Sequence, residues 1–123
     1  MSVLGLDHVN IAGPAELIDR VRNFYVDVIG LVEGARPSFH RRGYWLYAGE
    51  HAVVHLTVSD DATGATGSFN HFALSCEGLN ATIERLKKHG VAYELAHVPQ
   101  TNRVQLFVRD PAGVGVELGF REG

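Results

Sequence analysis

Residues 105–118 read QLFVRDPAGVGVEL, and they decide how the last part of the chain folds. The runs on either side of DPAG, 104–109 and 114–120, are rich in valine, leucine and phenylalanine, which favours strands. Asp, Pro and Gly in DPAG each suit a position in a tight turn. We therefore expect two strands joined by a turn, with Glu117 in the middle of the second strand.

A strand, a helix and a further strand are predicted before this pair. Alternating apolar residues predict strands at 69–75 and 93–97. Leu79, Ile83 and Leu86 mark the helix between them, which ends before Gly90. The second half of the chain is thus strand, helix and three strands.

The first half shows the same order of elements. A strand is expected at 6–12, and apolar residues at helical spacing then continue as far as Gly30. Three extended pieces follow, at 31–33, 44–47 and 52–58. The order of the second half is therefore present twice, which indicates an internal repeat.

Matching landmarks support the repeat. His8 and His71 are 63 residues apart, and His55 and Glu117 are 62 apart. We expect an α+β fold of two tandem βαβββ modules, about 4–58 and 68–121, in a single domain over 1–123. Residues 59–67 are small and polar and would form the linker. The modules would form a curved mixed sheet around a cavity, with the helices outside.

The composition of the chain limits the kinds of partner and metal ligand that we expect. The 123 residues carry a formal charge of −3, so a basic surface for nucleic acid or anionic membranes is not expected. No apolar run approaches the ~20 residues that span a bilayer, and the N-terminus lacks signal-peptide features. We therefore expect a cytoplasmic protein. With Cys76 as the only cysteine against seven histidines, a metal site would have to use imidazole and carboxylate groups.

Four repeat-related positions carry such groups in predicted strands: His8, His55, His71 and Glu117. Polar groups inside a packed sheet need partners, because burying them unpaired costs free energy. One divalent ion would satisfy all four. Nitrogen and oxygen ligands suit Fe²⁺, Mn²⁺, Zn²⁺, Ni²⁺ or Co²⁺, and ligand type does not choose among them. The competing interpretation is that each histidine is an ordinary hydrogen-bonded residue.

The repeat, the DP-x-G-x-x-x-E pattern at 110–117 and FYVDVIGL at 24–31 together resemble the vicinal oxygen chelate superfamily. The resemblance covers 6–120 and implies a metal held by His8, His71 and Glu117. It implies that His55 is either a fourth ligand or the acid–base group. Its members include glyoxalases, epimerases, fosfomycin-resistance transferases, extradiol dioxygenases and metal-free bleomycin-binding proteins.

Several other residues are candidates for substrate binding. Asn10 shares a strand face with His8. Arg36, Arg41 or Arg42 is suited to clamp a substrate carboxylate, and Phe39 and Trp45 offer an apolar wall. Arg103 is a further candidate for contacting an anion. Phe107 stands where extradiol dioxygenases usually have a tyrosine. The alternative for Arg36 and Trp45 is a solvated basic loop followed by core or interface aromatic residues.

The resemblance implies a divalent-metal-dependent enzyme acting on a small substrate with vicinal oxygens. His55 tilts this prediction slightly toward dioxygenase-like chemistry, whereas Phe107 counts against it. The alternatives are a glyoxalase- or epimerase-like lyase or isomerase, and a metal-free antibiotic-binding module. A homodimer is implied in each case, with the ligands of one site coming from one chain or from two.

Overall fold

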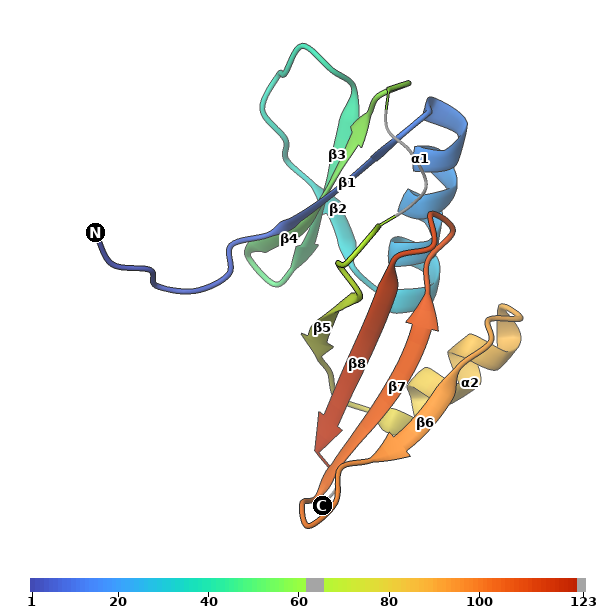
Figure 1. The fold of residues 1–123 in the computed structure, drawn as a ribbon. Coiled ribbons are helices and arrows are strands. Elements are labelled where there is room, and N and C mark those ends of the chain that lie inside the picture. Colours follow the sequence, from blue (N-terminus) through green and yellow to red (C-terminus); the bar gives the residue numbers. More distant parts are fainter. Residues whose placement is uncertain (62–65, 122–123) are drawn as a thin grey trace. The chain divides into compact units, whose positions relative to one another are not determined.

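The structure is a computed structural model that describes residues 1–61 and 66–121 (Figure 1). The chain folds as two compact units, Met1–Thr63 and Gly64–Gly123. Each unit contains one four-stranded sheet and one α-helix. Within the described residues, no helix is long and apolar enough to span a membrane.

Unit 1 begins with a strand and a two-part helix. β1 (Val9–Gly13) leads into α1 (Ala15–Asn23), which continues as the π-helix η1 (Phe24–Ile29). Three strands follow: β2 (Val32–Gly34), β3 (Gly43–Ala48) and β4 (His51–Val58). The sheet order is β1-β4-β3-β2, with β1 parallel to β4 and the other pairs antiparallel.

Unit 2 repeats this arrangement. β5 (His71–Ser75), α2 (Leu79–Lys88), β6 (Glu94–His97), β7 (Arg103–Arg109) and β8 (Gly115–Arg121) follow in order. The sheet order is β5-β8-β7-β6, again with the first strand parallel to the last. The predicted α+β fold of two βαβββ modules is therefore confirmed.

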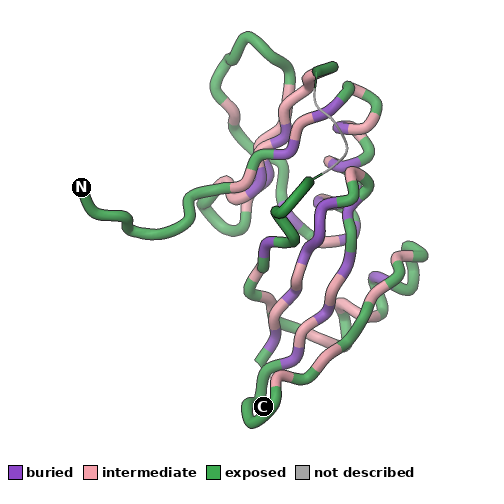
Figure 2. The backbone as a smooth tube through the Cα atoms, viewed as in Figure 1, coloured by how far each residue is buried: buried purple, intermediate pink, exposed green. Residues whose placement is uncertain are grey.

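Each unit has its own apolar core on one face of its sheet. Buried residues alternate with less buried ones along β7 and β8, as expected for a strand with one covered face (Figure 2). In unit 1 the buried strand residues include Ile11, Leu46 and Leu56. The opposite face of each sheet is left for polar side chains, and the candidate site lies there.

Several predicted boundaries were wrong by a few residues. β1 begins at Val9, so His8 precedes the strand, and His71 is the first residue of β5. The expectation that His8 and His71 lie in the middle of a strand was therefore wrong. Residues 59–61 and 66–67 contain no helix or strand, as expected of a linker, while 62–65 lie outside the described residues.

Candidate functional site

Three candidate residues of unit 1 form a row across neighbouring strands. Asn10 of β1 is the register partner of His55 on β4, and His55 is the partner of Trp45 on β3. Register partners in neighbouring strands point to the same face of a sheet. The row therefore lies on the face opposite Leu46 and Leu56, where the sheet does not carry the core.

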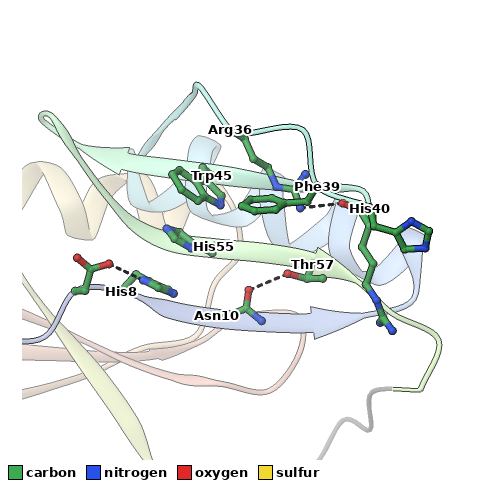
Figure 3. A pocket seen from close by; sticks show the side chains of 10 residues that line it. His8, Asn10, Arg36, Phe39, His40, Trp45, His55 and Thr57 are labelled. Atoms are coloured by element: carbon green, nitrogen blue, oxygen red, sulfur yellow. Dashed lines mark hydrogen bonds and ion pairs between the residues drawn. The ribbon is translucent and has the colours of Figure 1, made fainter.

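The imidazole of His55 is stacked between two other rings. The His8 and His55 ring centroids are 3.7 Å apart with an interplanar angle of 15°. On its other side, His55 lies 4.1 Å from the Trp45 centroid at an angle of 12°. These three side chains form a column in Figure 3, and we call it the ring column. It limits the rotation of His55.

Hydrogen bonds determine which nitrogen of each ring is left for another partner. The carboxylate of Asp7 accepts from Nδ1 of His8 at 2.7 Å, which leaves Nε2 as the nitrogen that can meet another partner. For His55 the roles of the two nitrogens are reversed, because Nε2 donates to the carbonyl of Ala52 at 3.1 Å. Burial is the main cause that lowers the pKa of His55, and the neighbouring His8 reinforces it. The neutral ring of His55 thus presents Nδ1.

Unit 2 brings His71 and Glu117 together. Nε2 of His71 lies 3.3 Å from Oε1 of Glu117, and its Nδ1 hydrogen bonds to Oδ1 of Asn70 at 2.7 Å. Gln105 donates to the other carboxylate oxygen of Glu117 at 3.3 Å. The ring of Phe107 meets His71 edge-on, with centroids 5.9 Å apart.

Gly115 allows β5 and β8 to approach closely beside this pair. A Cβ atom built at Gly115 would lie 2.5 Å from the carbonyl oxygen of Asn70 and 2.9 Å from Cβ of His71. Such contacts are too short for any side chain at this position. A glycine is therefore required for His71 to start its strand opposite residue 115.

The two units carry corresponding rows at equivalent positions. Ala73, Glu117 and Phe107 are register partners across β5, β8 and β7, as Asn10, His55 and Trp45 are in unit 1. The residue before each histidine, Asp7 or Asn70, binds its Nδ1 in both units. The predicted repeat thus extends to the residues that orient the rings.

A pocket of about 650 Å³ opens on the ring column of unit 1 (Figure 3). Its wall includes five predicted site residues: His8, Asn10, Arg36, Trp45 and His55. It also includes Phe39 and Arg41, which the sequence offered as further candidates for substrate binding, and three residues that did not figure among the predictions: Asp7, His40 and Thr57. Thr57 had a signal in the sequence, because it lies two residues after His55 and shares its strand parity.

The remaining candidates lie in unit 2. Phe107 contacts His71, as described above. Arg103 is the exposed first residue of β7, four residues before Phe107, and its guanidinium passes over Gly119. His97, at the end of β6, pairs with buried Val104, so its parity differs from that of Phe107.

Two pairs of side chains, His8 with His55 and His71 with Glu117, carry atoms that suit a divalent ion. Imidazole nitrogens and a carboxylate are suitable ligands, and a hydrogen-bonded Nδ1 is the usual support for an imidazole that binds through Nε2. Each pair alone supplies two donors, whereas metal sites commonly use three or more protein ligands. Among the described residues, no His, Cys, Asp and Glu side chains form a group of three or more that could hold a metal.

Comparisons with known proteins agree on one family. A family model described as the Glyoxalase/Bleomycin resistance protein/Dioxygenase superfamily matches residues 5–118. A Bacillus anthracis structure described as a glyoxalase family protein is 25% identical, with a TM-score of 0.81 and 99% and 98% of the two chains covered. No curated protein sequence matches the chain.

Two further structures share the fold at lower identity. TnmS3, an antibiotic-binding protein from Streptomyces sp. CB03234, is 20% identical, with a TM-score of 0.71 and 99% of each chain covered. A mutant of the fosfomycin resistance protein FosX from Listeria monocytogenes, complexed with Mn(II) and a dihydroxypropylphosphonic acid, is 14% identical, with a TM-score of 0.73 and 98% and 95% covered. With the family model spanning nearly the whole chain, this protein belongs to the glyoxalase/bleomycin resistance protein/dioxygenase superfamily.

Proposed function

We propose that the protein is a divalent-metal-dependent enzyme acting on a small substrate with two neighbouring oxygens. His8, His71 and Glu117 are the proposed ligands, and His55 is a fourth ligand or the acid–base group. Fe²⁺, Mn²⁺, Zn²⁺, Ni²⁺ and Co²⁺ all suit this set. The Mn(II) complex of the FosX mutant supports a metal in a protein of this fold.

The contact between His71 and Glu117 carries the proposal. Because Nδ1 of His71 hydrogen bonds to Asn70, Nε2 is the nitrogen that faces a carboxylate oxygen of Glu117, 3.3 Å away. Two acceptors at this distance repel one another unless a proton or a cation lies beside both. A divalent ion meets that need. Asp7 holds Nδ1 of His8 in the same way as Asn70 holds Nδ1 of His71, which suits His8 to bind the ion through Nε2 as well.

A metal bound by these residues would supply a Lewis acid that polarises the substrate oxygens. The protein's own residues would do the rest. Nδ1 of the neutral His55 is available to accept a proton from the substrate. Asn10 and Arg36 would hold polar groups of the substrate, and Trp45 would exclude water from one side of the pocket.

Metal analysis tests this proposal. We expect the chain to bind one Mn²⁺ per protomer in calorimetric titration after dialysis against chelator. His8→Ala and His71→Ala should each weaken binding at least tenfold, because each substitution removes one of the proposed ligands. His89→Ala, on the exposed residue that follows α2, is the matched control. Failure to bind any divalent ion, or an unchanged affinity in His71→Ala, contradicts the proposal.

Two kinds of chemistry compete within this class. A histidine at position 55 favours oxygen-dependent ring cleavage, for which catechols and Fe²⁺ in air should yield a yellow product. Lyase or isomerase activity should instead proceed under nitrogen with Ni²⁺ or Zn²⁺, on adducts of α-oxoaldehydes and thiols. The first result with no activity under nitrogen would assign the protein as a dioxygenase.

A metal-free antibiotic-binding protein is the second candidate. The ring column favours it, because stacked aromatic rings beside a pocket bind flat molecules well. TnmS3 supports it as an antibiotic-binding protein of the same fold. Tight binding of a ligand that chelators leave unchanged, in a chain that binds no metal, would establish this candidate instead.

A further inference from the structure

The pocket of unit 1 offers several hydrogen-bond donors, on an amide and on two arginines. Thr57 donates to Oδ1 of Asn10 at 2.9 Å, which fixes the amide and leaves its NH₂ group for another partner. The arginines of the pocket can only donate. Its carboxylate, on Asp7, already binds His8. A ligand that pairs with these donors has to bring acceptor oxygens.

Arg36 is the group that most needs such an oxygen. Its Nη2 donates to the carbonyl of Arg41 at 2.9 Å, and its guanidinium lies 4.8 Å from the Phe39 ring centroid. Its Nε is buried and has no hydrogen-bond partner among the described residues. A buried donor without a partner is unfavourable, because it has lost its water and gained nothing in return. The side chain is held in place while its charge has no carboxylate partner among the described ion pairs.

The charge of the pocket favours an anion. Arg36 and Arg41 stand against Asp7, so the formal charge of its wall is +1 when the histidines are neutral. Arg41 also donates to Ser59 at 2.7 Å, which leaves its charge uncompensated. A guanidinium pairs best with a planar group bearing two oxygens, such as a carboxylate.

The aromatic side chains favour a flat apolar body next to that anion. Phe39 lies 6.1 Å from the Trp45 centroid at an angle of 43°. It is more than half exposed, although it is a large apolar residue. Phe39 is carried by the segment 35–42, which contains no helix or strand. In Figure 3, Arg36, Phe39 and Trp45 lie together on one side of the pocket.

We propose that this pocket binds a small planar aromatic carboxylate, with the carboxylate on Arg36 and the ring against Phe39 and Trp45. As a statement of substrate class, this rests on the enzyme function proposed above. As a statement about binding, it concerns only residues of unit 1 and needs no metal. Asn10 would donate to a second polar group of the ligand through its NH₂ group.

Calorimetric titration with 1-naphthoate and the neutral 1-naphthamide tests the proposal. In chelator-treated protein, naphthoate should bind at least tenfold more tightly than naphthamide, because a hydrogen-bonded charge pair is worth that much. Arg36→Gln should reduce naphthoate binding to the level of naphthamide and leave naphthamide unchanged. Arg20→Gln, on an exposed residue of α1 outside the pocket, should bind naphthoate as the unmodified chain does.

A second measurement locates the ligand. Trp45 is the only tryptophan, so the protein has a single indole N–H signal in its NMR spectrum. Naphthoate should shift that signal in the unmodified chain. Equal affinity for the two ligands, an unchanged affinity in Arg36→Gln or an unmoved indole signal overturns the proposal. Naphthoate binding in a chain that takes up no metal would support this proposal while the metal-dependent function fails.

Discussion

At the scale of single residues, His55 shows how the burial of a stacked ring shifts its protonation equilibrium. Its ring is enclosed by His8 and Trp45, and burial lowers its pKa from the usual 6.5. In the unfolded chain the ring titrates near its usual value. Between the lowered pKa and 6.5, the unfolded chain therefore binds more protons than the folded one. The contribution of His55 to the free energy of unfolding should rise with pH through that window and stay level above it.

Nuclear magnetic resonance can measure this directly. With ¹³C-labelled histidine, the ring signal of His55 should titrate with a midpoint below that of the same residue in urea-unfolded protein. The signal is assigned by its loss in His55→Ala. A folded midpoint equal to or above the unfolded one would show that the ring is not enclosed as the structure has it.

Sequence reasoning identified the central residues of the pocket but not all of its wall. His8, His55 and Asn10 were predictable because the repeat and strand parity place them together. Asp7 and His40 were not, because their contribution depends on side-chain direction at a strand entry and in a loop. No periodicity constrains such positions.

At the scale of elements, the turn between β7 and β8 depends on one buried carboxylate. Oδ1 of Asp110 accepts from the backbone N–H groups of Ala112 at 2.8 Å and Val114 at 3.0 Å. Asp110→Ala removes both and leaves one buried and one part-buried donor unpaired, so we expect a loss of about 1–3 kcal/mol in the free energy of unfolding. Asp110→Asn keeps an acceptor oxygen and should lose less.

Urea unfolding followed by circular dichroism measures these differences. Glu94→Ala is the control, because Glu94 is an exposed acidic residue on the neighbouring strand β6. It should change the free energy of unfolding by no more than about 0.5 kcal/mol. If Asp110→Ala is as mild as this control, the carboxylate does not hold the turn.

The DPAG turn was predictable because its residue types act locally, and the structure confirms it. The π-helix η1 was not predictable. The N–H groups of Gly30 and Leu31 both donate to the carbonyl of Tyr25, at 3.0 and 2.9 Å, and Gly30 has a φ of 96°. The apolar spacing at 17–28 shows which side of a helix is buried. It does not distinguish α from π hydrogen bonding over six residues.

At the scale of the whole molecule, the repeat explains why the candidate donors come in pairs. Equivalent positions carry His8 and His71, and His55 and Glu117, so each unit supplies two groups. Within each unit the first strand runs parallel to the last, and the histidine at or just before the start of the first strand contacts the donor on the last strand. A set of four donors depends in addition on tertiary or quaternary contacts, which no periodicity in the sequence encodes.

The exposed N-terminal segment 1–8 leads to a prediction about assembly. Val3, Leu4 and Leu6 are largely exposed, and the segment forms no helix or strand. Apolar side chains grouped in this way usually contact another surface. We expect the protein to be a homodimer that buries this segment against a second copy, as measured by light scattering coupled to size-exclusion chromatography.

Replacing leucines of the segment separates this role from folding. Leu4→Ser with Leu6→Ser should shift the protein toward the monomer, because each serine removes apolar area from the contact. Leu4→Ile with Leu6→Ile keeps that area and should remain dimeric. Since neither leucine is part of the core of unit 1, the circular dichroism of both variants should match the original. A dimer that survives the serine substitutions would mean that other surfaces hold the two copies together.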